Sequence, residues 1–189
     1  KILAVRAEKW ISTASKNLQA QLVDKDLAML RKHFDFTYSL AKGRANYLCK
    51  RKVDRLVDAI EKGDRRDVAD LDLIDSWETT TGDFGELEQP FKNKVRYGCD
   101  GCVGSSCKYI KNPLDPCHYM VAAKGRYTDN VIVTNHHLLC IDLLIHDRKI
   151  FAARGEDPPD VIIVDEAHKF EEVARATLTS EFTRHKVPK

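Results

Sequence analysis

The amino-acid sequence predicts an α/β fold built on a parallel β-sheet. Two β-branched segments, Val131–Thr134 and Val161–Val164, lack polar alternation, which is typical of strands buried on both faces of a parallel sheet. The apolar, helix-length segment His137–Phe151 lies between them and completes a β-α-β unit. A further strand is predicted at Trp10–Thr13, and the spacing of apolar residues predicts a helix over Lys16–Phe34.

The length and composition of the chain fit one globular domain and exclude several classes of protein. It has 189 residues, of which 43% are hydrophobic and 32% are charged, and its net charge is +2. Nine glycines and six prolines are too few for collagen, and the apolar content is too high for a disordered chain. No apolar run approaches the ~18 residues of a transmembrane helix, so we expect no association with a membrane.

The middle of the chain departs from the α/β pattern. Residues 45–127 contain an acidic segment, a group of closely spaced cysteines and most of the glycines. We therefore expect residues 45–127 to be an insertion, with residues 1–44 and 128–189 forming the two parts of the α/β domain.

The cysteines indicate a metal site. Four of the six lie between Cys99 and Cys117, and a chain without a visible secretory signal more often uses such a group to bind metal than to form disulfides. The spacing alone fits two kinds of site equally well. Cys99, Cys102, Cys107 and Cys117 would complete a tetrahedral zinc site, whereas an iron–sulfur cluster would also use the distant Cys49.

Two acidic residues follow the strand predicted at Val161–Val164. Chemistry in an open α/β sheet gathers at the carboxyl ends of the strands, where Asp165 and Glu166 stand. Asp165 would hold Mg²⁺, and Glu166 would orient or deprotonate the water that attacks a γ-phosphate. His168 would link this nucleotide site to a neighbouring element. The alternative is a helix N-terminus whose acids complement the helix dipole.

These residues carry a family resemblance. The segment VIIVDEAH, residues 161–168, resembles motif II of the superfamily 2 helicases, a DEAH box. Four other segments are similar to motifs of the DinG/XPD branch and occur in the same order, namely Ser12–Leu22 (motif Ia), Lys42–Cys49, Cys102–Cys117 and Thr134–Leu139. The sequence as a whole resembles the DinG-like helicases most.

The resemblance implies a partial RecA-like motor domain with an inserted iron–sulfur module. It implies a four-iron four-sulfur cluster held by Cys49, Cys102, Cys107 and Cys117, with Cys99 as a substitute for Cys102. The parent protein would be an ATP-dependent 5′→3′ DNA helicase of DNA repair that works as a monomeric motor. We expect it in the cytoplasm of a bacterium or of a phage-infected host.

The expected partners are single-stranded DNA and junctions between duplex and single strand. Thr13, Gln19 and Gln21 lie in motif Ia, which borders the DNA track in the family that the sequence resembles. Lys94, Arg96 and Tyr97 place basic and aromatic side chains before the cysteine group, a combination typical of single-strand channels. The alternative is that the tyrosine packs around the cluster.

The phosphate-binding loop of such a motor is missing from the sequence. No Gly-x-x-x-x-Gly-Lys-Ser/Thr occurs, and the chain begins with Lys1. We therefore expect an internal fragment that neither hydrolyses ATP nor unwinds DNA by itself, although the complete protein would bind ATP and Mg²⁺. The alternative from another functional class is a non-enzymatic zinc-binding nucleic-acid module with a vestigial motor half.

Overall fold

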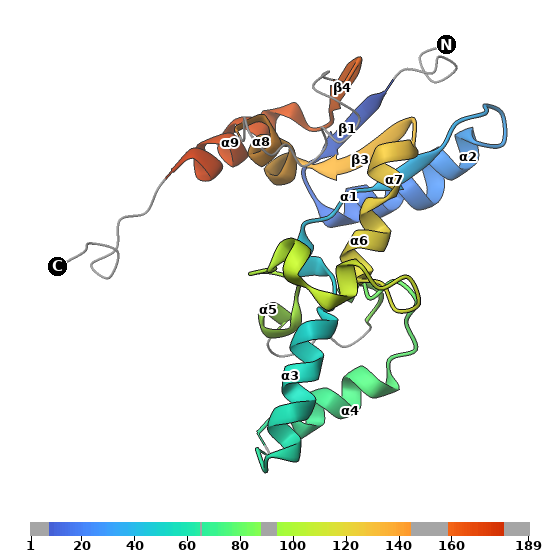
Figure 1. Ribbon diagram of the computed structural model, residues 1–189. Helices are drawn as coiled ribbons and strands as arrows, with labels where there is room; N and C mark the ends of the chain where they lie inside the picture. Colours follow the sequence, from blue (N-terminus) through green and yellow to red (C-terminus); the bar gives the residue numbers. More distant parts are fainter. Residues whose placement is uncertain (1–7, 65, 88–93, 145–158, 180–189) are drawn as a thin grey trace. The chain divides into compact units, whose positions relative to one another are not determined.

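The computed structural model describes residues 8–64, 66–87, 94–144 and 159–179, which fall into two compact units (Figure 1). The sheet unit comprises Lys1–Ala41 and Gly125–Lys189, and the cysteine unit comprises Lys42–Lys124. Residues 45–127, where the sequence predicts an insertion, overlap the cysteine unit. In the part of the chain that the structure describes, no helix combines the length and the hydrophobicity that crossing a membrane would require.

A four-stranded parallel sheet forms the centre of the sheet unit. Its strands are β1 (Lys9–Thr13), β2 (Tyr38–Leu40), β3 (Val131–Asn135) and β4 (Val161–Val164), in the spatial order β2-β3-β1-β4. Lys9 lies opposite Val131 on one side and Val161 on the other, so three strands end at the same edge of the sheet. The predicted α/β fold with a parallel sheet is confirmed.

One face of the sheet is covered by a helix that follows β1 directly. Helix α1 (Lys16–Gln21) starts where the Ser15 hydroxyl accepts a hydrogen bond from the Leu18 amide. It continues through the π-helical segment η2 (Leu22–Leu27) into α2 (Ala28–Leu30), so the helix ends earlier than its predicted end at Phe34. The residues that pack this face are Ile11, Leu27, Phe36, Val131 and Val133.

The opposite face is covered by α8 (His136–Leu144) and α9 (Phe170–Leu178), the latter preceded by the short turn η8 (Ala167–Lys169) (Figure 1). Trp10 and Ile132 pack there against Leu138 and Leu139 of α8. The last seven residues of the predicted helix His137–Phe151 lie outside the described residues. A short helix, α7 (Gly125–Thr128), lies against β2.

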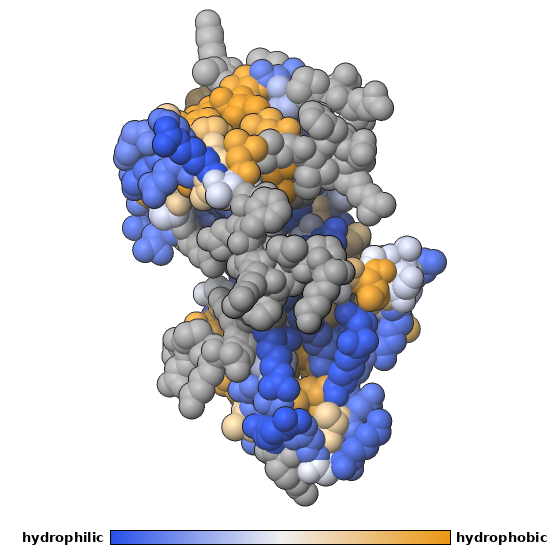
Figure 2. Space-filling view, turned by 90° about the vertical axis from the view of Figure 1, so that its left-hand side faces the viewer, coloured by the Kyte–Doolittle hydropathy of each residue, from blue (hydrophilic) through white to orange (hydrophobic). Residues whose placement is uncertain are grey.

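The strand β4 differs from the prediction that it is buried on both faces. Val131, Ile132 and Val133 of β3 are fully buried, as predicted, but Ile162 and Ile163 of β4 are each 41% exposed. The reason is the strand order, because β1 lies between β3 and β4 and leaves β4 at the edge. Figure 2 shows one face of the molecule, on which a group of hydrophobic residues, coloured orange, is exposed at the surface.

The cysteine unit consists of short helices and turns. Its helices are α3 (Lys50–Glu61), α4 (Val68–Ser76), α5 (Lys94–Tyr97) and α6 (His118–Ala123), and its 3₁₀ turns are η3 (Arg44–Asn46), η4 (Phe84–Glu86), η5 (Gly104–Ser106) and η6 (Lys108–Ile110). Isolated bridges pair Leu48 with Gly98 and Tyr47 with Asp83. A core of its own, which includes Leu56, Ile74 and Phe84, stabilises this unit.

Candidate nucleotide site and cysteine cluster

The acidic pair lies at the carboxyl edge of the sheet, beside the end of β1. The strand register sets Ser12 of β1 opposite Val164 of β4 and Thr134 of β3. The Asp165 amide donates a hydrogen bond of 2.9 Å to the Ser12 carbonyl, which extends the β1–β4 pairing by one residue. Asp165 is exposed at this edge. The sheet therefore fixes the backbone of Asp165 and leaves its carboxylate accessible.

Glu166 has an unusual backbone conformation. Its φ of 47° lies in the left-handed region, which residues other than glycine rarely adopt, and it is the one such non-glycine residue in the described part of the chain. Its amide donates to Asp165 Oδ1 at 3.0 Å, and its carboxylate accepts from Lys169 Nζ at 2.8 Å. The hydrogen bond from Lys169 lowers the pKa of Glu166, so the side chain is a carboxylate at neutral pH.

A buried histidine joins the ends of three strands. His136 begins α8 directly after β3, is 1% exposed, and its Nδ1 lies 2.7 Å from the Ser12 hydroxyl oxygen. Its ring meets the Phe170 ring edge-on, at 5.3 Å between centroids. Burial lowers the pKa of His136, although the nearby peptide groups and charges of Asp165 and Glu166 oppose this shift. A neutral imidazole at this position is the consequence.

His168, which the sequence suggested as a link to a neighbouring element, is exposed on η8. It lines a surface hollow with Glu171, Glu172 and Arg175. His136 has the contacts that such a link requires, and the sequence reasoning gave it no role. The position of His136 could have indicated this role, because His136 and Ser12 each stand at the carboxyl end of a predicted strand.

The motif Ia residues are divided between the interior and the surface. Thr13 is buried, and its hydroxyl donates to the Ser15 carbonyl at 3.2 Å. Gln19 is buried as well, and its Nε2 has no hydrogen-bond partner among the described residues. Gln21 is exposed. Of these three side chains, Gln21 is the one placed to meet a ligand in this conformation.

The basic and aromatic residues before the cysteine group are likewise divided. Arg96 is half exposed and pairs with Asp67 at 2.6 Å. Tyr97 is buried, and its hydroxyl donates to Asp70 at 2.6 Å; burial, followed by this bond, raises its pKa. The side chain of Lys94 lies outside the described residues. Tyr97 therefore packs in the interior of the cysteine unit.

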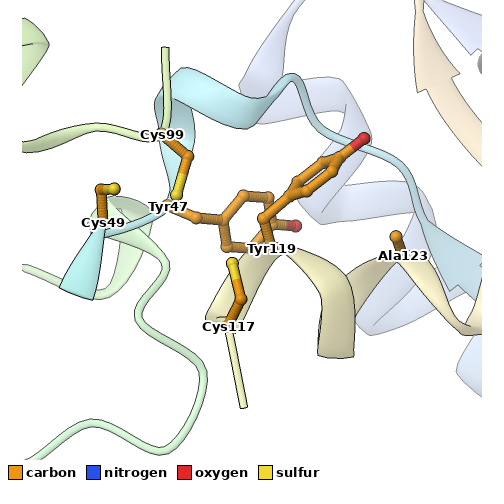
Figure 3. Packing of buried hydrophobic residues seen from close by; sticks show 6 residues of the cluster. All are labelled: Tyr47, Cys49, Cys99, Cys117, Tyr119 and Ala123. Carbon is orange, nitrogen blue, oxygen red and sulfur yellow. The ribbon is translucent and has the colours of Figure 1, made fainter. Parts of the chain in front are cut away.

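Three cysteines gather in a buried cluster. Cys49, Cys99 and Cys117 pack with Tyr47 and Tyr119, and Figure 3 shows the three thiols turned toward one another. The antiparallel bridge between Leu48 and Gly98 contributes to this meeting. It sets Cys49 opposite Tyr97 and Cys99 opposite Tyr47, so the two cysteines flank the bridge on its two sides. All six cysteines have free thiols.

The thiols of this cluster influence one another. The Cys99 thiol donates a hydrogen bond to the Leu48 carbonyl at 3.6 Å. Its interaction with the neighbouring thiols raises the pKa of Cys99 and lowers the pKa of Cys49 and of Cys117 to about 6. Deprotonated sulfur is the form that binds metals. Cys49 and Cys117 are therefore the thiols most ready to act as ligands.

The two remaining cysteines of the group lie nearby in the sequence. Cys107 is buried and precedes η6, whereas Cys102 is half-buried and its sulfur accepts a 3.4 Å hydrogen bond from the Gly104 amide. Among the described residues, no three His, Cys, Asp or Glu side chains are arranged closely enough to hold a metal ion. Cys99, and not Cys102, is the cysteine that packs with Cys49 and Cys117 in this cluster.

Basic side chains surround the cluster, and several of them are paired with acids. Lys50 pairs with Asp115, and Lys52 pairs with Asp100 at 2.7 Å. Lys108 pairs with Asp54 of α3 at 2.9 Å. The basic character of this surface is thus partly neutralised by partners within the cysteine unit.

Comparisons with known proteins find several sequences that are similar to this chain. No protein-family model matches it. It is 34% identical over 175 residues to the ATP-dependent DNA helicase YoaA of Haemophilus influenzae and 33% identical over 186 residues to the protein of that name from Escherichia coli. These alignments cover 87% and 90% of the chain. The 3′-5′ exonuclease DinG of Bacillus subtilis is 31% identical over 92% of the chain.

The chain corresponds to a minor part of each relative. It covers 26% of the Haemophilus influenzae protein, 28% of the Escherichia coli protein and 18% of the Bacillus subtilis protein. The similarity runs through both units of the structure, since it extends over about nine-tenths of the chain. The chain therefore belongs to the DinG-like helicase family.

Proposed function

We propose that this chain is part of an enzyme that couples ATP hydrolysis to movement along single-stranded DNA and to the unwinding of duplexes. The observation that carries the proposal is the acidic pair at the carboxyl edge of the sheet. Asp165 is anchored to the Ser12 carbonyl at 2.9 Å, and Glu166 follows in a strained backbone conformation. Strain of this kind persists where the surrounding structure holds it, and it is common at catalytic sites.

Each acid has a distinct role in this proposal. The exposed Asp165 carboxylate would accept hydrogen bonds from the water ligands of Mg²⁺. The bound Mg²⁺ would compensate the negative charge of the ATP phosphates. Glu166 would orient the attacking water and take its proton. To do so, its carboxylate must leave Lys169, and the ion pair between them is exposed and weak enough to break.

The test is the ATPase activity of the full-length protein with and without single-stranded DNA. Glu166→Gln keeps the shape of the side chain but removes the base, so we expect ATPase activity to fall by ~10³-fold or more while ATP still binds. Glu172→Gln, on the exposed side of α9, is the matched control and should keep full activity. Equal activity in both variants would refute the proposed role of the acidic pair.

The isolated 189-residue chain should lack this activity. A phosphate-binding loop supplies backbone amides, a lysine and a hydroxyl to the nucleotide, and its motif is absent from the sequence. We expect no ATP hydrolysis above background from the chain alone. Hydrolysis that disappears in the Glu166→Gln form of the chain would contradict this expectation.

We further propose that the cysteine unit holds a four-iron four-sulfur cluster. The donor set fits this group in chemistry and number, since five thiols belong to the unit and three of them already face one another. Cys49, Cys107 and Cys117 would be three ligands, and either Cys99 or Cys102 the fourth. When bound, the group would tie together segments of the unit that are far apart in sequence.

Metal analysis of anaerobically purified protein tests this second proposal. About four irons and four sulfides per chain are expected, with loss of both in Cys49→Ser. Cys140→Ser is the matched control, because Cys140 is buried in the sheet unit and should leave the iron content unchanged. One zinc per chain that survives Cys49→Ser would instead support the zinc-binding module.

For DNA, we propose contacts from the exposed side chains Gln21 and Arg96. The buried Thr13, Gln19 and Tyr97 would shape the surface behind them. Alanine at Gln21 or Arg96 should weaken the binding of single-stranded DNA, measured by fluorescence anisotropy. Junction substrates with a 5′ or a 3′ overhang test the proposed 5′→3′ direction, and sedimentation tests the monomeric state.

A further inference from the structure

The cysteine unit contains one thiol more than the proposed cluster needs. A four-iron four-sulfur cluster takes four cysteine ligands, whereas the segment Lys42–Lys124 contains five cysteines. Cys99 is the most deeply buried of the five, at 2% exposed, while Cys102 is half-buried. Because the fourth ligand can come from Cys102, the Cys99 thiol is available for other chemistry.

Cys99 packs against two thiols that the proposed cluster would use. It belongs to the same buried group as Cys49 and Cys117, and Figure 3 shows its sulfur between the other two. Its thiol donates a hydrogen bond of 3.6 Å to the Leu48 carbonyl. Neighbouring thiols in one buried site can be oxidised to a disulfide, which a lone cysteine in a core cannot form.

The backbone favours Cys117 over Cys49 as the partner of Cys99. Cys49 and Cys99 flank the antiparallel bridge described above, so they are diagonal neighbours across it. Diagonal neighbours lie ~7–8 Å apart, whereas a disulfide joins residues whose Cα atoms are ~4.4–6.8 Å apart. Cys117 lies outside this pairing, since its amide donates to the Tyr109 carbonyl and it precedes α6 directly. It can therefore approach Cys99 without opening the bridge.

We propose that Cys99 is a spare thiol that forms a disulfide with Cys117 when the protein meets a peroxide without its cluster. This inference rests on the proposed function, because Cys117 is one of the proposed iron ligands, and it adds a redox site to it. The disulfide takes Cys117 out of the ligand set, and a dithiol reductant returns it. Disulfides in reducing compartments are usually transient and redox-sensing in this way.

One molecule of hydrogen peroxide balances the reaction. The Cys117 sulfur is the more accessible of the two, at 8% exposed, and attacks a peroxide oxygen. The O–O bond breaks, the sulfur becomes a sulfenic acid, and the first water leaves. The Cys99 sulfur then attacks the Cys117 sulfur, the S–O bond breaks, and the second water leaves with the proton of the Cys99 thiol. The two sulfurs give up two electrons, and these reduce the peroxide.

The position of Cys99 also protects Cys117 from permanent damage. A sulfenic acid that meets no second thiol is oxidised further to a sulfinic acid, which thiol reductants do not reverse. Cys99 lies beside Cys117, so it can capture the sulfenic acid first. Its own burial keeps peroxide away from its sulfur.

The experiment uses the full-length protein, from which iron is removed by a chelator in the presence of a reductant. After the reductant is removed, hydrogen peroxide is added and the free thiols are blocked with N-ethylmaleimide. Mass spectrometry of unreduced peptides should then find a peptide that links Cys99 to Cys117. Treatment with dithiothreitol should return both thiols.

Cys99→Ser tests the role of the spare thiol. It should be purified with about four irons per chain, because Cys102 supplies the fourth ligand. After iron removal and peroxide treatment, Cys117 should be found as a sulfinic acid that dithiothreitol does not reverse. Circular dichroism verifies that the variant is folded, and the peptide map of the wild type decides the pairing without any variant.

Cys140→Ser is the matched control. Cys140 is also deeply buried, at 4% exposed, but it belongs to the sheet unit. This variant should give the same linked peptide as the wild type, and dithiothreitol should return both thiols.

The outcomes separate this inference from the proposed cluster. A peptide that links any other pair of cysteines, or no linked peptide, refutes the inference, while iron in the untreated wild type leaves the proposed cluster standing. Loss of iron from folded Cys99→Ser would make Cys99 a ligand and refute its role as a spare thiol. If the wild type never contains iron but links Cys99 to Cys117, the proposed cluster fails and the disulfide site is supported.

Discussion

Glu166 combines a backbone conformation that is unfavourable for stability with a proposed catalytic role. Its left-handed backbone is unfavourable for a residue with a Cβ atom and is free of strain for glycine. We expect Glu166→Gly to raise the melting temperature of the protein by roughly 2–5 °C and to abolish ATP hydrolysis. Differential scanning calorimetry and an ATPase assay measure the two effects.

Glu166→Gln is the control for this prediction. It keeps the Cβ atom and therefore the strained backbone, so it should lose activity without gaining stability. If both variants melted at the same temperature, the left-handed conformation would not store strain.

Gly98 is a position in the cysteine unit where a side chain does not fit. A Cβ atom there would lie 2.6 Å from the Ala45 carbonyl oxygen, and backbone cannot move aside as a side chain can. We expect Gly98→Ala to destabilise the unit by about 1–3 kcal/mol and to lower its metal content, because Cys49 and Cys99 flank the bridge between Gly98 and Leu48. Denaturant titration and iron analysis are the measurements.

Gly43→Ala provides the comparison for Gly98→Ala. A Cβ atom at Gly43 would meet the Asn46 side chain at an ordinary distance of 3.7 Å. This variant should therefore keep both stability and metal content. Similar losses in the two alanine variants would mean that the close approach at Gly98 is not the cause.

At the scale of elements, Asp54 ties helix α3 to the turn η6. It accepts hydrogen bonds from the Tyr109 hydroxyl at 2.7 Å and from Lys108 at 2.9 Å. Burial alone would raise the pKa of Asp54, but these two hydrogen bonds outweigh it, so the pKa lies below its usual value. The contribution to stability is complete above the unfolded pKa of ~3.9 and is lost as the pH falls through the lower folded pKa.

Asp54→Asn tests this contact through its pH dependence. We expect the variant to melt at most ~3 °C below wild type at pH 6, because exposed ion pairs are screened. The gap should close as the pH is lowered from 5 to 2. Circular dichroism melts across this range measure it, and a gap that stayed constant with pH would show that the charge of Asp54 is not involved.

The sequence was sufficient to predict three of the four strands of the described sheet, and it missed β2. β-branched runs and helical spacing are local signals, so β1, β3 and β4 lie within one residue of the predicted ends. The edge position of β4 was not predictable, because strand order depends on pairing between distant segments. The same holds for Ser12 and His136, which are 124 residues apart and meet only in the folded sheet. The crowding of Cys99 with Cys49 and Cys117 likewise depends on a bridge that no spacing reveals.

At the scale of the whole molecule, the two units have separate cores. Apolar clusters of the sheet unit draw on its strands and helices, and those of the cysteine unit draw on residues between Tyr47 and Ala123. If the proposed cluster binds the cysteine unit, its removal should destabilise that unit selectively. After iron is removed by a chelator, amides of α3 and α6 should exchange with deuterium at least ~10-fold faster.

The amides of β1 and β3 are the internal control for this exchange experiment. Their hydrogen bonds lie in the sheet unit, so their protection should not change when iron is removed. Uniform loss of protection throughout both units would show that the molecule unfolds as one cooperative body.

The way the chain leaves and re-enters the sheet unit has a further consequence. The sheet unit ends its first part at Ala41, just after β2, and resumes at Gly125, where a Cβ atom would lie only 2.7 Å from Ser39. The two splice points are thus neighbours within the sheet unit itself. A short Gly-Ser linker could therefore connect them. All 83 intervening residues, Lys42–Lys124, could then be removed or replaced by a different module, and the strand order of the sheet would stay the same.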